Sequence, residues 1–244
     1  MIKYHGTPIG GTIDEVQRFL PNRHCLVSYH HPDQIDSVAQ LSSSFILDNG
    51  AFSFWKSGKG DIDFSAYHAF VQRWANHPRL DFCIIPDKID GTEDDNVNLV
   101  TRWLKTGSDV ESVPVYHYNE SLDYLAYLVS HFRTVALGSS AEAEPNSAEW
   151  WKRTSQIMKV ACNKAGRPKA RLHGLRMLNP DIFTRIPLTS ADSTNVAVNS
   201  GSINRFGYYV PPTRSLRAAV IADRIELLNS CSEWTNFEQQ QLHL

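Results

Sequence analysis

The feature that most restricts the fold of this sequence is a regular alternation of short apolar runs with longer amphipathic segments. Strands that alternate with helices are typical of parallel β/α units, and eight parallel strands are the number that closes a barrel. The eight runs are Ile2–His5, Cys25–Tyr29, Phe45–Asp48, Phe82–Ile85, Val113–Tyr116, Thr134–Leu137, Ala170–His173 and Pro187–Asp192. We therefore predict a single (β/α)8 TIM barrel over residues 1–244. The main rival is a doubly wound open sheet, but neither G-x-G-x-x-G nor G-x-x-x-x-G-K-[ST] occurs.

The segments between the runs have the apolar spacing of helices. Thr12 and Glu15 have capping-box spacing and predict a helix start. The segment 195–212 is polar and irregular, so we expect a loop over the barrel mouth. The expected helices are 12–20, a segment from Pro32, 63–74, a segment around 97–104, 122–129, 148–161 and 213–228.

Composition narrows the class of protein. Hydrophobic residues make up 42% and charged residues 20%, an ordinary globular balance. The net charge of −2 gives no general attraction to nucleic acid or membrane, so a polyanion would need a local patch. The four cysteines lie far apart, which predicts neither a zinc knuckle nor a disulfide framework. No signal peptide or membrane-length apolar stretch is evident, so we expect a cytoplasmic protein without membrane contact.

Polar residues follow nearly every apolar run. Catalytic groups of a β/α barrel lie at the carboxyl ends of its strands, so these residues are predicted to be neighbours around one mouth. They are His5, His30–His31, Asp48–Asn49, Asp87–Lys88, His117, Gly138–Ser139–Ser140, His173 with Arg176, and Asp192–Ser193.

Three aspartates among them are the main candidates for chemistry. Asp48 leaves a buried strand into an Asn-Gly turn, where it serves either as an acid/base or base-recognition carboxylate or as an Asx-turn. Asp87 is suited to accept protons from the donor edge of a guanine-like base, or to form a structural salt bridge with Lys88 or a neighbouring arginine. Asp192 is framed by small hydroxyl residues, which suits a nucleophile, although an N-cap is the structural alternative.

Five segments between about Phe45 and Asn195 together resemble motifs of the tRNA-guanine transglycosylase superfamily, which includes phage and bacterial DNA transglycosylases that insert 7-deazaguanines. The segments are Leu47–Phe52, similar to its D-S-G-G-F segment; Cys83–Asp87, similar to its base-reading strand; Ala136–Ser140, similar to its Gly-rich loop; Leu172–Leu175; and Ser190–Thr194, similar to its nucleophile strand.

The resemblance implies exchange of guanine for a 7-deazaguanine through a covalent Asp–sugar intermediate. Asp192 would be the nucleophile, Asp48 the acid/base and Asp87 the group that holds the departing base. The other expected substrate-binding residues are Asn49, Gly50, His117, Gly138, Ser139, His173, Gly174 and Arg176. The family's zinc motif, C-x-C-x-x-C followed by a His, is absent and the chain is short. We therefore expect no metal or other cofactor, DNA rather than tRNA as the partner, and a phage-type member.

Three other functions remain open. A metal-dependent hydrolase barrel would use His117, His173 and Asp192 as ligands, although the usual H-x-H at the first strand is missing. An ADP-ribosyltransferase is suggested by the segment Tyr4–Thr7, but that fold is mixed and rich in β-structure. The last alternative is a non-catalytic binding barrel. A protein partner is possible and its identity is unknown from the sequence.

Overall fold

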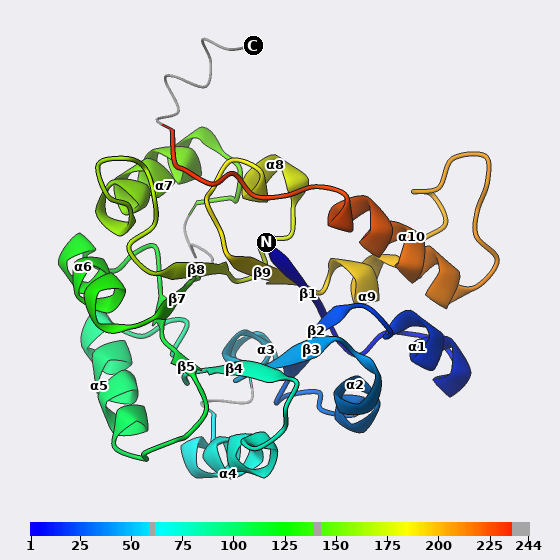
Figure 1. The fold of residues 1–244 in the computed structure, drawn as a ribbon, viewed down its shortest axis with the longest axis horizontal. Coiled ribbons are helices and arrows are strands. Elements are labelled where there is room, and N and C mark those ends of the chain that lie inside the picture. The colour runs from blue at the N-terminus through cyan, green and yellow to red at the C-terminus, as the bar shows by residue number, and fades with distance from the viewer. Residues whose placement is uncertain (59–61, 139–142, 236–244) are drawn as a thin grey trace.

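Parallel strands form a closed ring in the computed structural model, which describes residues 1–58, 62–138 and 143–235 (Figure 1). All eight ladders are parallel, and the strand order is β5-β4-β3-β2-β1-β9-β8-β7-β6. The strands are β1 (Ile2–Gly6), β2 (His24–Ser28), β3 (Ser44–Asp48), β4 (Leu80–Ile84), β5 (Ser112–Val113), β6 (Val115–Tyr116), β7 (Thr134–Leu137), β8 (Arg171–Gly174) and β9 (Ser190–Ser193).

The ring closes at Pro114, which separates β5 from β6. These two short strands are the ends of the sheet order, and β5 pairs with β4 while β6 pairs with β7. Proline has no N–H to donate, so it divides the ladder at this point. The two pieces therefore occupy one strand position, and the predicted (β/α)8 TIM barrel is confirmed.

Helices surround the ring on its outside (Figure 1). The predicted capping box at Thr12 is present, because Glu15 N donates to Thr12 Oγ1 and Thr12 N donates to Glu15 Oε2. No helix in the described ranges has the length and apolar character needed to cross a bilayer. The helices are α1 (Ile13–Phe19), α2 (Ile35–Leu41), α3 (Ala51–Lys56), α4 (Phe64–Trp74), α5 (Glu93–Leu104), α6 (Leu122–His131), α7 (Ala148–Ala161), α8 (Pro180–Phe183), α9 (Asn195–Asn199) and α10 (Arg214–Glu226).

Three short helices, α3, α8 and α9, were not predicted. Helix α3 begins directly after Asp48-Asn49-Gly50, where Gly50 takes a left-handed φ of 79°. The side chain of Asp48 accepts from Gly50 N and that of Asn49 accepts from Ala51 N, so these two donors are satisfied. The segment 195–212 begins with α9 and is therefore not a loop throughout, as the sequence suggested.

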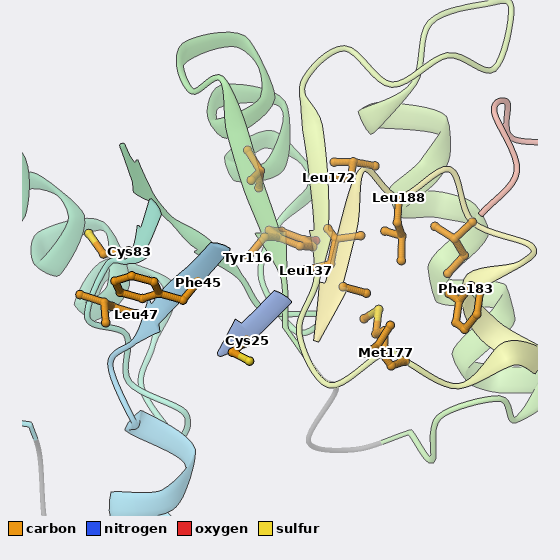
Figure 2. Packing of buried hydrophobic residues seen from close by; sticks show 14 of the residues in the cluster. Cys25, Phe45, Leu47, Cys83, Tyr116, Leu137, Leu172, Met177, Phe183 and Leu188 are labelled. Atoms are coloured by element: carbon orange, nitrogen blue, oxygen red, sulfur yellow. The ribbon is translucent and has the colours of Figure 1, made fainter. Parts of the chain in front are cut away.

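The hydrophobic core has two parts. The outer cluster lies between the strands and the surrounding helices, and Figure 2 shows some of its members, including Phe45, Leu137 and Phe183. The inner cluster fills the barrel itself, and its buried members are Tyr4, Leu26, Ile46, Phe82, Ile84, Val113, Val115 and Ala136. Because successive strand residues face opposite sides, this division tells which side chains point into the ring.

Polar contacts close the amino-terminal end of the barrel. Tyr4 donates its hydroxyl hydrogen to Asp81 Oδ2 at 2.6 Å, and the Ser44 hydroxyl contacts the same carboxylate. The His24 ring lies 2.8 Å from the Ser44 hydroxyl through Nδ1. Together, the inner cluster and these contacts fill the barrel at the amino-terminal ends of its strands.

Candidate active site

A cavity of about 640 Å³ lies at the carboxyl ends of the strands. Its size suits a small metabolite. Charged and polar side chains from many strand ends converge on it, as the sequence predicted. The titratable residues in its lining are His30, His31, Asp48, Lys56, Asp87, His117, Arg176, Asp192 and Arg214.

Asp48 is a carboxyl group of the cavity with a strongly raised pKa. Leu47 belongs to the outer cluster, so the next residue of β3, Asp48, faces into the ring. Burial raises its pKa to about 7, with a further contribution from the negative charges of Asp192 and Asp87. Hydrogen bonds from Gly50 N, at 3.0 Å, and from Ser28 oppose this rise but do not cancel it. Asp48 therefore exchanges its proton near neutral pH.

Asp192 is the most deeply buried of the three acids, with 3% of its surface exposed. It lies on β9, and its Oδ1 is 3.2 Å from His173 Nε2 and accepts a hydrogen bond from Arg176 N at 3.1 Å. His173 Nδ1 lies 2.9 Å from the Ser190 hydroxyl, which orients the ring from the other side. These contacts hold the Asp192 carboxylate in one position.

Asp87 belongs to a chain of buried polar contacts beside the cavity. Its Oδ2 lies 3.0 Å from His117 Nε2, and its Oδ1 accepts from Asn49 Nδ2 at 2.7 Å. Burial alone would lower the pKa of His117, but the Asp87 carboxylate and Glu120 raise it overall. Glu120 Oε2 in turn accepts from His117 N, and Glu120 Oε1 accepts from Asn96 Nδ2. Asn49 thus fixes the Asp87 carboxylate, and Glu120 fixes the backbone of His117.

Arg176 covers one side of the cavity. It has a φ of 59°, in the left-handed region that few residues other than glycine adopt. Its guanidinium carbon lies 3.7 Å from the ring centroid of Phe52 on α3. This backbone conformation directs the amide of Arg176 to Asp192 while its side chain extends towards α3.

Most of the predicted site residues line the mouth cavity, three lie outside its lining, and one is not among the described residues. Those that line the cavity are Asp48, Asn49, Asp87, His117, Gly138, Arg176 and Asp192. Gly50, His173 and Gly174 are outside this lining: Gly50 starts α3, His173 lies behind Asp192, and Gly174 packs against Leu188 and Met177. Ser139, like Ser140, lies outside the described residues.

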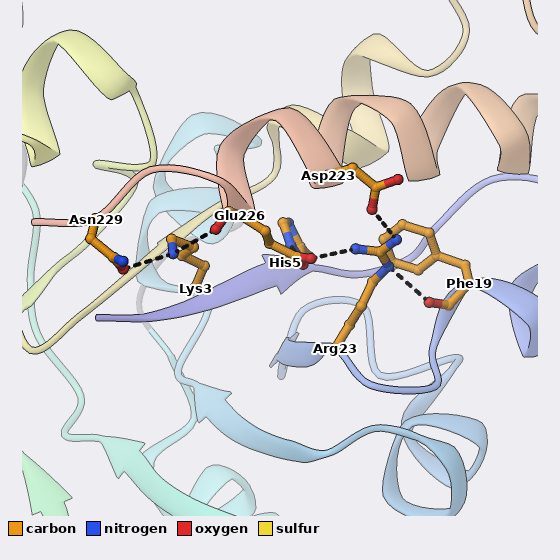
Figure 3. A network of polar contacts seen from close by, with 7 residues as sticks. All are labelled: Lys3, His5, Phe19, Arg23, Asp223, Glu226 and Asn229. Atoms are coloured by element: carbon orange, nitrogen blue, oxygen red, sulfur yellow. Dashed lines mark hydrogen bonds and ion pairs between the residues drawn. The ribbon is translucent and has the colours of Figure 1, made fainter.

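His5 does not reach the cavity, contrary to the expectation from its place at a strand end. Tyr4 points into the barrel, so His5 points outward, and its Nε2 lies 2.8 Å from Glu226 Oε1 of α10. Arg23 pairs with Glu226 and with Asp223 on the same helix (Figure 3). His5 thus belongs to a network between β1 and α10 and is not an active-site candidate.

Sequence reasoning missed several cavity residues, among them Phe52, Lys56 and Arg214. Phe52 and Lys56 lie on the unpredicted helix α3, and Arg214 is the first residue of α10. The first turn of a barrel helix lies near the carboxyl ends of the strands, so the expected helix start near Thr213 was a usable signal for Arg214.

A second cavity of about 750 Å³ lies on the other side of α3. It shares Ala51, Asp87 and Ile89 with the mouth cavity, but neither Asp48 nor Asp192 lines it. It is larger and is lined by Asp87, Asp90 and Asp95, but it lacks the pair Asp48 and Asp192, so we place the candidate chemistry in the mouth cavity.

The sequence matches no family model and no curated protein. Among solved structures, a mutant tryptophan synthase alpha-subunit from Pyrococcus furiosus is similar, with a TM-score of 0.53, 8% identity, and coverage of 93% of this chain and 97% of that chain. A protein of Aquifex aeolicus VF5 has a TM-score of 0.51, 9% identity, and coverage of 92% and 90%, respectively. The likeness is one of fold. At these identities it supports the barrel and carries no activity over to this chain.

The resemblance to the tRNA-guanine transglycosylase superfamily is not supported, and the predicted base exchange through Asp192 is withdrawn as wrong. Of the two similar structures named above, one is a tryptophan synthase alpha-subunit, and neither is described as a transglycosylase. Strand-end aspartates are common to barrels with many activities, so motifs this short and degenerate did not specify a superfamily. DNA or tRNA and a 7-deazaguanine as partners, the absence of a cofactor and a cytoplasmic location have not been tested and stay predictions.

The structure also bears on two other functions considered from the sequence. Within residues 1–58, 62–138 and 143–235, no three His, Cys, Asp or Glu side chains are arranged to hold a metal ion. His117, His173 and Asp192 therefore do not form the ligand set of a metal-dependent hydrolase. The closed parallel barrel also differs from the mixed β-rich fold of an ADP-ribosyltransferase.

Proposed function

We propose that this protein is an enzyme that moves a proton on a small polar substrate, in a reaction of the isomerase or lyase class. The observation that carries the proposal is Asp48, a carboxyl group with a pKa of about 7 in a cavity that also contains Asp192 and Asp87. Acids and bases with pKa values near the working pH are the most effective in proton transfer.

Asp48 and Asp192 have different environments, which suits them to different roles. The proton of Asp48 is retained near neutral pH by burial and by the charges of its neighbours. The Asp192 carboxylate is held by a backbone N–H and by its contact with His173. We assign Asp48 as the general acid and Asp192 as the general base, a division of labour seen where two carboxyl groups have different surroundings.

The proton balance of this step is simple. Asp192 takes a proton from a C–H or O–H group of the substrate, and Asp48 gives a proton to another atom of the same molecule. The Asp87–His117 pair lies beside them and presents hydrogen-bonding groups that orient the substrate. Exchange with solvent then restores the two carboxyl groups to their starting states.

Deuterium incorporation into a panel of small molecules tests this proposal while the substrate is still unidentified. Hydroxy acids, keto acids, sugars and amino acids are incubated with the protein in D₂O at pD 7, and C–H to C–D exchange is followed by NMR. We expect exchange in at least one compound, and a fall of about 100-fold or more in Asp48→Asn, since general acid–base groups contribute on this scale. Asp109→Asn, at an exposed position outside the cavity, is the matched control.

Two results would contradict the proposal. One is exchange that persists unchanged in Asp48→Asn. The other is a wild-type protein that exchanges no proton in any compound, which would favour the non-catalytic binding barrel instead.

A further inference from the structure

The mouth cavity is lined by both acidic and basic side chains, which come from different elements. Three carboxyl groups, Asp48, Asp87 and Asp192, lie at its strand ends, while its other lining residues include three cationic side chains that have no part in the proposed proton transfer. We call Lys56, Arg176 and Arg214 the cationic rim. They come from separate elements: the last turn of α3, the turn after β8 and the first turn of α10.

Arg176 reaches across the mouth from a distant part of the ring. In the strand order, β8 and β3 are separated by β9, β1 and β2, and with β5 and β6 counted as one position they stand opposite each other in the eight-membered ring. The Arg176 guanidinium nevertheless stacks 3.7 Å from the ring of Phe52, which lies just beyond β3. A substrate near Asp48 and Asp192 therefore meets this guanidinium.

Arg214 is fixed at its place by its surroundings. Its Nε donates to Ser200 Oγ at 3.2 Å and its Nη2 donates to Ala197 O at 3.0 Å. The guanidinium packs directly on Gly10, where an added Cβ would lie 2.3 Å from its central carbon. A longer residue at position 10 would displace it.

Among the described residues, no carboxylate is paired with the side chains of the rim. In the part of the chain that the structure describes, neither Arg176, Arg214 nor Lys56 forms an ion pair with an acid. The partners of the two guanidinium groups are an aromatic ring, a hydroxyl and a carbonyl, all of them uncharged. Guanidinium groups bind carboxylate and phosphate oxygens with paired hydrogen bonds, so a rim of this kind suits an oxyanion.

We propose that the cationic rim is an oxyanion subsite, with Arg176 as its specificity-determining residue, and that the substrate carries a phosphate or carboxylate group beside the carbon that reacts. This inference rests on the proposed function for the location of the reacting carbon. The substrate lies with its anionic group at the rim and its reacting end at Asp48 and Asp192. The opposite orientation would place its anion among three carboxyl groups.

Calorimetric titration of the protein with inorganic phosphate, and separately with malonate, tests the subsite. We expect single-site binding of at least one anion in the wild type, and about tenfold weaker binding in Arg176→Gln, with partial recovery in Arg176→Lys. The matched control is Arg185→Gln, because Arg185 also lies over an aromatic ring, that of Trp151, but outside the cavity. Far-UV circular dichroism checks that each variant is folded.

The outcomes separate the subsite from the proposed function. Binding of phosphate alone indicates a phosphate monoester, and binding of malonate alone indicates a carboxylate. The subsite is rejected if neither anion binds, or if Arg176→Gln binds as tightly as Arg185→Gln. Asp48→Asn should keep its anion binding, so loss of deuterium exchange in that variant concerns only the acid–base chemistry.

Discussion

Replacement of Asp48 by asparagine is expected to stabilise the folded protein by up to about 4 kcal/mol at pH 8.5 and by less than about 1 kcal/mol near pH 4. The reason is the pKa of about 7 that burial and the charges of Asp192 and Asp87 give this group in the folded state. An ordinary aspartate titrates near pH 4, so the unfolded chain loses its proton first. The folded state binds the extra proton, and its stability therefore falls as the pH rises from about 4 to 7.

Asparagine suits this test because it removes the charge and keeps the shape. Its amide oxygen can still accept from Gly50 N, as Asp48 Oδ2 does. Urea denaturation at a series of pH values measures the difference in unfolding free energy between variant and wild type. Asp109→Asn is the control and should reproduce the wild-type pH profile. A difference between Asp48→Asn and wild type that does not change with pH would show that Asp48 carries no retained proton.

The same carboxyl group thus has opposite effects on stability and on the proposed chemistry. An enzyme that keeps an acid protonated near neutrality does so by burying it among like charges, which destabilises the fold at high pH. The variant that gains stability should be the variant that loses deuterium exchange.

Trp103→Ala is a core substitution with a large expected cost, about 3–5 kcal/mol of unfolding free energy. Trp103 is 1% exposed and lies on α5, where its ring packs against those of Phe64, Tyr67 and His68. Its indole Nε1 donates to Ser112 Oγ at 2.8 Å. Its removal leaves a large cavity between α4, α5 and the barrel and takes away the donor to the Ser112 hydroxyl.

Chemical denaturation followed by circular dichroism measures this loss. Trp103→Phe keeps most of the ring and gives up the hydrogen bond, so we expect it to lose about 1–2 kcal/mol. Trp55→Ala is the control because Trp55 is 48% exposed, and it should change stability by less than about 0.5 kcal/mol. A loss below about 1 kcal/mol in Trp103→Ala would contradict the packing of α5 against α4 and the barrel.

The barrel could be predicted from the sequence because each buried strand is a local run of apolar residues. The run Phe45–Asp48 coincides with β3 almost to the residue. The last strand was less well predicted, since β9 begins at Ser190 rather than Pro187. Leu188 N is instead bonded to the Ser230 hydroxyl, a contact with a segment about forty residues further on that no local pattern reveals.

The candidate site was predictable in part. The acids at the ends of β3 and β9 follow from the rule that strand ends share a mouth. The direction of a side chain depends on strand alternation, and this consideration would have excluded His5, since Tyr4 next to it occupies the barrel interior. The cationic rim depends on contacts between residues far apart in the chain, such as Arg176 with Phe52 and Arg214 with Gly10.

The chemistry of the mouth was harder to predict than the architecture around it. Short motifs around strand-end aspartates suggested a transglycosylase, whereas the similar structures, one of them a tryptophan synthase alpha-subunit, support only the barrel fold. The acids and cations of this mouth come from distant parts of the chain and are brought together only when the ring closes.

A carboxyl ¹³C NMR titration of the wild-type protein tests the protonation of Asp48 most directly, with the Asp48 signal assigned by its absence in Asp48→Asn. Burial of Asp48, together with the negative charges of Asp192 and Asp87, raises its pKa and predicts a titration midpoint near pH 7. A midpoint near pH 4, the value of an ordinary aspartate, would contradict its role as an acid that keeps its proton at neutral pH.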